Sequence, residues 1–261
     1  MCRPSYFTVS YEINPWMHPS VPTDTDLAVS QWQQLYDTYL ELGHQIDLID
    51  PAEGLPDMVY SANGALLSSG VVYTAKFTYP ERAPEAPLYG QWFADRGFQV
   101  HVAQETNEGE GDILTVGDLV LAGTGFRTST QAHAELQEVI GKPVISLQLV
   151  DPRFYHLDTA LMVLSSTEIA YYPPAFSEGS RRVLETLFPD AVIATEADAV
   201  VLGLNGVSDG RHVICNPRAT DLMEALAERG FETIGIDTSE LLKGGGGVKC
   251  CTLEIREAAS A

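Results

Sequence analysis

The chain has 261 residues, and its 15 lysines and arginines against 36 aspartates and glutamates give a formal net charge of −21 at pH 7. This charge argues strongly against nucleic acid as a partner, because binding phosphates needs a basic face. Apolar residues make up 45% of the chain and charged residues 20%, which is typical of a folded protein with a sizeable core and not of a disordered acidic tail.

The sequence also bears on location and redox state. It has no apolar run of the roughly 18 residues that span a membrane, and residues 1–5 lack the layout of a signal peptide, so a cytoplasmic protein is expected. The four cysteines are too few for a disulfide framework at this length. Two of them, Cys250 and Cys251, are neighbours that bridge each other only with strain, so free thiols are predicted.

Five units recur along the chain, each an amphipathic helix followed at once by a short β-rich run. The first helix is predicted over about residues 26–42, where apolar residues recur at three- and four-residue spacing. Gly43 ends this helix, and residues 44–49 then alternate as a strand should.

The other four units follow the same plan. The third helix opens with a capping-box pattern at residues 128–131. The later helices are predicted at about 85–97, 128–141, 178–188 and 220–229, and the strands that follow them at 98–102, 144–147, 191–194 and 231–236. Further strand-like runs between the units are 64–77, 113–121, 160–172, 199–203 and 211–215.

Each repeat, roughly 40–55 residues long, contains one helix and about three strands, and self-similarity at such a period is typical of a propeller or an array. We therefore predict one α/β domain over residues 1–261 that consists of five repeated modules. A doubly wound parallel sheet also alternates strands and helices, but it needs only one strand per helix and fits less well.

The strongest local signal for chemistry is the run of residues 243–255, where four glycines precede Cys250. Glycines allow a backbone to approach a ligand closely, and the thiol is expected where this loop enters a final strand. The neighbouring Lys249 would favour the thiolate, which is the nucleophilic form. A buried structural cysteine beside a flexible loop is the alternative, and this segment alone leaves the two interpretations even.

A second candidate is the run of residues 154–159, which leads into an apolar strand. Alternate residues of a strand share a face, so His156 and Asp158 are expected to point into one pocket as a proton shuttle and a cation-binding carboxylate. A satisfied structural pair is the commoner meaning of this spacing. A second histidine at ligand spacing is missing, so no metal is expected.

Three further runs are weaker signals. Residues 107–112 carry three carboxylates, which form either a bland acidic loop or a group that holds a cation or orients a histidine. Residues 55–64, which include Asn63, suggest a turn that enters a strand. Residues 123–128 superficially resemble a dinucleotide loop but lack the third glycine.

Taken together, these segments resemble the amidinotransferase superfamily, the pentein enzymes that modify guanidinium groups, which include dimethylarginine dimethylaminohydrolase and arginine dihydrolase. The resemblance extends over nearly the whole chain, from residues 7–17 to Cys250, and its Ile-Asn-Pro-Trp-Met and Ser-Ala-Asn pieces are specific to a branch. It implies the pentein fold, a five-bladed α/β propeller with the active site on the central axis.

The resemblance also implies roles for individual residues. Cys250 is the nucleophile that forms a covalent thiouronium, and His156 protonates the departing amine and then activates water. Glu108 orients His156, with Glu110 as the alternative. The implied substrate contacts are Asp112 and Asp158 to the guanidinium, Arg82 and Arg127 to the amino-acid end, and Asn14 and Asn63 as further binding positions.

Two positions bear on the substrate. By resemblance, mammalian-type dimethylargininases carry a lysine two places after the histidine and an acidic residue at the position of Asn63. Here the pair is Asp158 and Asn63, which resembles arginine dihydrolase, an enzyme that releases both guanidino nitrogens as ammonia and leaves ornithine. Extra carboxylate contacts favour unmethylated N–H donors, because a methyl group leaves an acceptor unpaired at a cost of roughly 1–3 kcal/mol.

The sequence thus predicts a cytoplasmic hydrolase of a small cationic amino acid, with no cofactor and no metal. Bacterial chains of this branch are commonly called dimethylargininases, so arginine and methylated arginines are near-equal candidates, with a slight preference for arginine. Amidino transfer to a second amine and arginine sensing without turnover are the alternatives. A monomer and a homodimer are both left open.

Overall fold

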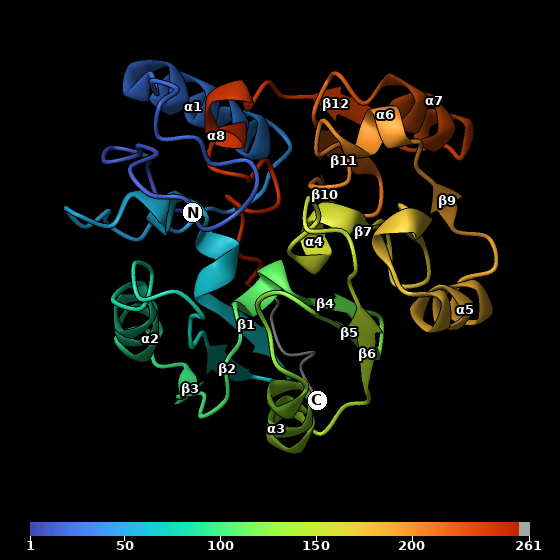
Figure 1. The fold of residues 1–261 in the computed structure, drawn as a ribbon, viewed down its shortest axis with the longest axis horizontal. Helices are drawn as coiled ribbons and strands as arrows, with labels where there is room; N and C mark the ends of the chain where they lie inside the picture. The colour runs from blue at the N-terminus through green and yellow to red at the C-terminus, as the bar shows by residue number, and fades with distance from the viewer. Residues whose placement is uncertain (256–261) are drawn as a thin grey trace.

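The computed structural model describes residues 1–255, and the strands in this range form four separate sheets of three strands each. The larger helices lie on the outside of a ring of such units (Figure 1). These helices are α1 (Thr25–Glu41), α2 (Glu85–Ala94), α3 (Thr130–Ile140), α5 (Glu178–Leu187) and α7 (Thr220–Glu228). The fold is therefore α/β, as expected.

All four sheets have the same topology. The first two strands pair antiparallel, and the third is parallel to the second and is reached through a helix, as parallel neighbours require. The sheets consist of β1 (Ala65–Ser68), β2 (Val71–Thr74) and β3 (Gln99–His101); β4 (Ile113–Val116), β5 (Leu119–Thr124) and β6 (Val144–Gln148); β7 (Leu161–Val163), β8 (Ile169–Tyr171) and β9 (Val192–Ile193); and β10 (Val207–Ser208), β11 (His212–Cys215) and β12 (Glu232–Gly235). Separate small sheets contradict the doubly wound alternative.

Short helices connect these units and carry much of the centre of the molecule. They are η1 (Pro56–Val59), η2 (Ser61–Gly64), η3 (Gly109–Gly111), α4 (Leu157–Ala160), η4 (Pro173–Ala175), α6 (Glu196–Ala199) and α8 (Ser239–Leu242). Within residues 1–255, the structure has no helix with the length and apolar character needed to cross a bilayer.

The five predicted long helices all form, with ends within about three residues of those expected. Gly141, at φ 67°, adopts the left-handed conformation that ends α3, as its sequence signal predicted. The capping box predicted at residues 128–131 is wrong, because the Ser129 side chain caps this helix by accepting from the Ala132 backbone N–H. The Thr128 hydroxyl instead donates to Asp112.

Three predicted strands are wrong. Residues 44–49 alternate in polarity but find a partner only at Ile49, which makes one isolated parallel bridge with Cys2. Residues 199–203 follow a capping box between Thr195 and Asp198, which starts α6 in place of a strand. The segment after Cys250 forms a turn and extended chain that pairs with no strand among the described residues.

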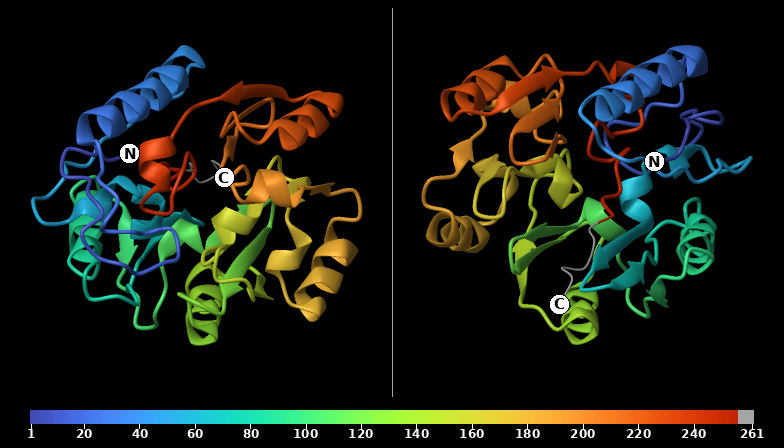
Figure 2. Two further views of the ribbon diagram at one scale, coloured as in Figure 1. Left: turned by 45° about the horizontal axis from the view of Figure 1, so that its top comes forward. Right: turned by 180° about the vertical axis from the view of Figure 1, so that it is seen from behind.

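Helix α1 joins the two ends of the described chain. Its buried side chains, including Trp32 and Leu35, share one hydrophobic cluster with Tyr60, Leu241 and Cys250. Helix α8, which lies close to the end of the chain, is beside α1 in all views (Figures 1 and 2). The loop that carries Cys250 is therefore held against the first helix.

This packing predicts that Leu35→Ala destabilises the protein by about 2–5 kcal/mol, because Leu35 is fully buried and its truncation leaves a cavity in the cluster. Leu40→Ala is the matched control, since Leu40 lies on the same helix but is 47% exposed. Urea unfolding measures both. Equal losses for the two variants would show that this cluster does not anchor α1.

Candidate active site

Cys250 lies in a turn at the end of the glycine-rich loop and is almost completely buried. Its Sγ donates to Oδ2 of Asp158 at 3.2 Å and accepts from Nδ2 of Asn205 at 3.1 Å. The Lys249 ammonium, which was expected to favour the thiolate, is paired with Glu110 at 2.6 Å. The groups that contact the sulfur are therefore a carboxylate and an amide.

The glycine-rich loop packs closely against aromatic residues. A Cβ at Gly246 would lie 2.5 Å from a ring carbon of Tyr60. Gly245 has φ +90°, and a Cβ there would lie 2.8 Å from both the Tyr155 hydroxyl oxygen and Oδ1 of Asn14. Only glycine provides this close approach and this backbone conformation, so the glycines bring Cys250 to its site.

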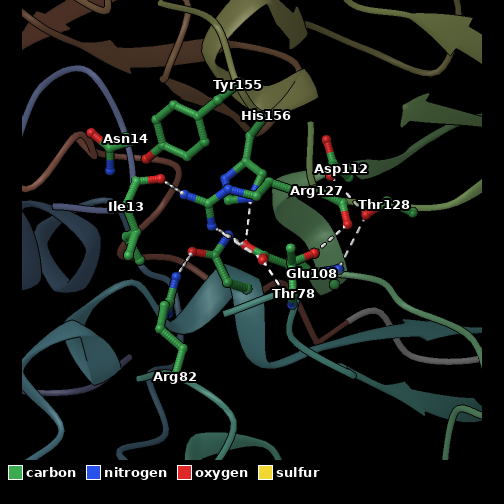
Figure 3. A network of polar contacts seen from close by, with 12 residues as sticks. Ile13, Asn14, Thr78, Arg82, Glu108, Asp112, Arg127, Thr128, Tyr155 and His156 are labelled. Atoms are coloured by element: carbon green, nitrogen blue, oxygen red, sulfur yellow. Dashed lines mark hydrogen bonds and ion pairs between the residues drawn. The ribbon is translucent and has the colours of Figure 1, made fainter. Parts of the chain in front are cut away.

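His156 and Glu108 form a hydrogen-bonded pair in the interior (Figure 3). Nε2 of His156 lies 2.7 Å from Oε2 of Glu108, while the other ring nitrogen, Nδ1, is buried with no hydrogen-bond partner. Glu108 also binds Arg127 at 2.8 Å. The structure thus places Glu108 against His156, whereas Glu110 binds Lys249.

The charge of Glu108 is set by two opposing effects. Burial favours its neutral form, but the Arg127 guanidinium and the hydrogen bond with His156 outweigh burial and hold the pKa of this carboxyl below its ordinary value. A carboxylate that stays ionised can orient an imidazole and stabilise its protonated form. This pair therefore has the geometry of a general acid–base group and its orienting partner.

Asp112 supports the same histidine through the backbone. Oδ1 of Asp112 accepts from the backbone N–H of Leu157, and Oδ2 accepts from the Thr128 hydroxyl. Burial raises the pKa of Asp112 to about 6. Both carboxylate oxygens already have a donor from within the protein, so in this structure Asp112 fixes the turn that carries His156.

Asp158 is the carboxylate that faces the thiol. It is fully buried, and its Oδ1 has no hydrogen-bond partner. Burial raises its pKa to about 7, although the hydrogen bond from Cys250 acts in the opposite direction. Burial, and then the nearby Asp158, also raise the pKa of the Cys250 thiol well above its ordinary value. Without a cation between them, the two groups thus disfavour being charged at the same time.

Asn63 and Arg82 lie beside this pair. Nη1 of Arg82 donates to Oδ1 of Asn63 at 2.7 Å, and its other guanidinium nitrogens bind both carboxylate oxygens of Glu85. Nδ2 of Asn63 is buried without a partner, and a Cβ at Gly111 would lie 2.2 Å from it and 3.1 Å from Nδ1 of His156. The space above Gly111 is therefore bordered by two unsatisfied nitrogens.

Arg127 and Asn14 border the site from the N-terminal segment. Nη2 of Arg127 donates to the Ile13 carbonyl at 2.7 Å, and its guanidinium lies over the rings of Tyr79 and Tyr155. Nδ2 of Asn14 donates to the Gly244 carbonyl. Residues 13 and 14 thus contact both Arg127 and the glycine-rich loop, and Figure 3 shows them on the Tyr155 side of the network.

One open cavity formed by the described residues lies away from this network. It has a volume of about 440 Å³ and is lined by side chains such as Tyr39, His44, Trp92, Asp209 and His212. None of the predicted site residues lines it. The predicted site residues are themselves buried, so the candidate site is closed in this structure.

The structure brings the predicted residues together, but some of them lie in other local structures than those expected. His156 and Asp158 do not share the face of a strand, because His156 caps α4 and Asp158 lies in its first turn. Cys250 lies in a turn and does not enter a strand. Sequence reasoning missed Asn205, whose only local signal is its place between Gly203 and Gly206.

Comparison with known proteins adds independent information. The sequence matches the family described as eukaryotic N,N-dimethylarginine dimethylhydrolase over residues 3–257. The N(G),N(G)-dimethylarginine dimethylaminohydrolase of Mycobacterium tuberculosis is 54% identical over 98% of this chain and 84% of its own length. The bifunctional arginine dihydrolase/ornithine cyclodeaminase ArgZ of Synechocystis sp. is 39% identical over 98% of this chain, which spans 37% of that longer protein.

A solved structure supports the same relationship. The N-terminal domain of ArgZ, a cyanobacterial protein, in a form covalently bound to a reaction intermediate, superposes with a TM-score of 0.94 at 38% sequence identity. The match covers 98% of this chain and 97% of that domain. The described fold therefore matches that of the ArgZ domain over almost its whole length.

The environment of Asp158 predicts a dependence of stability on pH. Because its pKa is raised to about 7, the folded state keeps a proton that the unfolded state releases near pH 4. Its contribution to the free energy of unfolding is thus complete below about pH 4 and lost as the pH rises through about 7. In Asp158→Asn, the free energy of unfolding should therefore fall less between about pH 4 and 7, by on the order of 4 kcal/mol.

Urea unfolding at several pH values between 4 and 8 measures this effect. Asp118→Asn, a change of an exposed aspartate in the turn between β4 and β5, is the control and should leave the slope as in the parent protein. An unchanged slope in Asp158→Asn would mean that the Asp158 carboxyl is ionised in the folded state.

Proposed function

Because the chain belongs to the N,N-dimethylarginine dimethylhydrolase family, we propose that it hydrolyses the guanidino group of L-arginine or of an Nω-methylated arginine. It would act on the C–N bond of a linear amidine. The observation that carries this proposal is the buried Cys250 thiol in contact with Asp158, in the same interior as the His156–Glu108 pair.

The charges around Cys250 favour a guanidinium as substrate. Asp158 contributes an oxygen that accepts no hydrogen bond, and a guanidinium supplies planar N–H donors that fit a carboxylate. Its positive charge beside the sulfur would also lower the pKa of the Cys250 thiol, which burial and Asp158 raise in its absence. The thiolate would then form when the substrate binds, and the thiol proton would pass to Nδ1 of His156, which later donates it to the departing amine.

The reaction follows from these positions. The Cys250 thiolate attacks the guanidinium carbon, a C–S bond forms, and the amine leaves as the C–N bond breaks with a proton from His156. The imidazole then takes a proton from water, and hydroxide attacks the thiouronium carbon as the C–S bond breaks. Nδ1 of His156 is the nitrogen free for these transfers, since Nε2 contacts Glu108. The covalent intermediate in the ArgZ domain supports this route.

Arg82 and Arg127 remain the proposed contacts for the amino-acid end of the substrate, with Asn14 as a further contact. Each guanidinium is already paired with a carboxylate, Glu85 or Glu108. Arg127 also donates to the carbonyl of Ile13, so binding a substrate carboxylate there would require this donor to change partner. We infer that the N-terminal segment around Asn14 shifts when the substrate enters the closed site.

The preference between arginine and methylated arginine is proposed from Asp158, which borders the site with an unsatisfied acceptor, Oδ1. A guanidinium N–H would donate to this oxygen, whereas a methyl group placed against it would leave it unpaired, so unmethylated arginine is slightly preferred. Nδ2 of Asn63, also unsatisfied, is a donor and would need an acceptor as its partner. Relatives carry both activities in their names, with dimethylarginine dimethylaminohydrolase at 54% identity and arginine dihydrolase at 39%.

We further infer that the full fold is a five-bladed propeller and one domain of residues 1–261, with the fifth blade assembled from both ends of the chain. The parallel bridge between Cys2 and Ile49 encloses α1, just as the parallel pairing of β2 and β3 encloses α2. The hydrogen bond between Tyr39 on α1 and Thr252 supports a contribution from the C-terminal segment.

The cellular setting is also part of the proposal. All four cysteines are free and buried, and reducing compartments keep thiols free, which favours the cytoplasm. Every side chain of the proposed site comes from one chain, so the proposed activity needs no second copy. A homodimer is compatible with it. The chemistry described here uses only side chains of the protein and the substrate, a small cationic amino acid.

The nucleophile is tested by Cys250→Ser, with Cys251→Ser as the matched control at the adjacent buried thiol. Turnover of arginine and the covalent adduct, trapped with acid and detected by mass spectrometry of the intact protein, should be lost in the first variant and kept in the second. Arginine binding, measured by calorimetry, should persist in the first variant.

An arginine sensor would keep its function in Cys250→Ser and form no adduct in the parent protein. Loss of the adduct in Cys251→Ser alone would contradict the assignment of the nucleophile. Amidino transfer would appear as product only when a second amine is added.

Substrate preference is tested by Asp158→Lys, which places a cation where the account requires an acceptor. We expect kcat/KM for arginine to fall more than that for asymmetric dimethylarginine, by about 10-fold or more for the loss of one charge-assisted hydrogen bond. Steady-state assays of ammonia and dimethylamine release give both values. An equal fall in kcat/KM for both substrates would contradict this explanation of the preference.

A further inference from the structure

Asn205 is a buried side chain whose every polar group is used around the nucleophile. Its Nδ2 donates to Sγ of Cys250 at 3.1 Å and to the backbone carbonyl of Asp158 at 3.2 Å. Its Oδ1 accepts from the backbone N–H of Gly247 at 2.9 Å and from that of Cys250 at 3.1 Å. Two donors and two acceptor positions are all that an amide has.

The backbone of Asn205 adds a further contact, because its carbonyl accepts from the N–H of Lys249 at 3.1 Å. One residue thus binds the glycine-rich loop, the backbone N–H groups of Lys249 and Cys250, the sulfur itself and the segment that carries Asp158. Asn205 comes from the connection between α6 and β10, far from Cys250 in sequence.

The chain around Asn205 is held in an unusual conformation. Leu202 has φ 52° and is buried, although side chains other than glycine rarely adopt the left-handed region. A Cβ at Gly203 would lie 2.4 Å from that of Ala219, and one at Gly206 would lie 2.5 Å from Met162 Cε. Strain and close packing on both sides leave Asn205 little freedom to move.

We propose that Asn205 is a catalytic residue for the function proposed above, one that orients Sγ of Cys250 and stabilises its thiolate through the amide N–H. Sγ in the resting protein lies between one acceptor, Asp158, and one donor, Asn205. When the thiol loses its proton, Sγ can no longer donate a hydrogen bond to Asp158. The bond from Asn205 persists and strengthens, because hydrogen bonds to an anion are stronger than those to a neutral group.

The orientation of Asn205 follows from its other contacts. The amide is planar, and the two backbone N–H groups that bind Oδ1 determine which side of it carries the donor nitrogen. A donor that is already directed at the sulfur needs no reorganisation when negative charge develops there. The same contacts hold the backbone of Cys250 in place.

Two variants separate the donor from the rest of the side chain. Asn205→Asp keeps an oxygen for Gly247 and Cys250 but turns an acceptor toward the sulfur, and Asn205→Ser removes the whole amide without adding charge. Asn216→Ser is the matched control, since Asn216 is also buried and its Nδ2 binds a backbone carbonyl, that of Val201, away from the thiol.

The measurement is the rate at which iodoacetamide alkylates Cys250 at one fixed pH of about 8.5, with the site identified by peptide mass spectrometry. At a pH below the pKa of the thiol, the rate follows the thiolate fraction, so it should fall by about 10-fold or more in Asn205→Ser, further in Asn205→Asp, and stay unchanged in Asn216→Ser. In arginine turnover, kcat should fall about 10- to 100-fold while KM changes little.

An unchanged alkylation rate in both folded variants of Asn205 would overturn the proposal, as would loss of the folded state in both, which would make Asn205 a folding residue. The alkylation rate requires no turnover. A lowered rate in a protein that does not hydrolyse arginine would therefore contradict the proposed function and leave the contact of Asn205 with the thiolate standing.

Discussion

Asp158 is buried against the Cys250 thiol with one carboxylate oxygen that accepts no hydrogen bond. An unsatisfied buried polar atom costs free energy, and the surrounding fold must compensate for it. The compensation comes from the rigid contacts around the pair, above all those of Asn205 and the glycine-rich loop. A planar cation with several N–H donors would satisfy the carboxylate and favour the thiolate at once. In the proposed function, one interaction would therefore both recognise the substrate and activate the nucleophile.

The rest of the site keeps this interaction apart from other charges. Arg127 and Arg82 are paired with Glu108 and Glu85, so neither guanidinium reaches Asp158 in this structure. Glu108 in turn contacts one nitrogen of His156 and leaves the other available. The N-terminal segment, the central short helices and the C-terminal loop all contribute to this arrangement, which explains why chemistry-bearing residues are spread from Asn14 to Cys250.

Sequence patterns predicted the elements whose signal is local. The five long helices follow from the spacing of their apolar residues, and Gly141 ends α3 as expected. The strand at residues 44–49 failed because a strand exists only where a partner is available, and here that partner is the single residue Cys2. Alternation of polarity carries no information about such a partner.

In the site, too, local patterns identify some residues, whereas other features depend on long-range contacts. His156, Asp158 and Cys250 could be selected by residue type and resemblance, yet the strand geometry expected to join them is replaced by a helix cap and a turn. The choice between Glu108 and Glu110 depends on which carboxylate the three-dimensional fold turns toward His156, which spacing alone does not determine. Asn205 escaped notice because asparagine between glycines is typical of a turn, and its function is visible only in its long-range contacts.

The central claim, that a guanidinium placed between Cys250 and Asp158 is hydrolysed, is tested most directly by mass spectrometry of the products. The purified protein would be incubated separately with L-arginine and with asymmetric dimethylarginine. The account predicts that arginine is hydrolysed, and the product shows whether one step gives citrulline or two steps give ornithine. The absence of any product from both compounds would contradict the account.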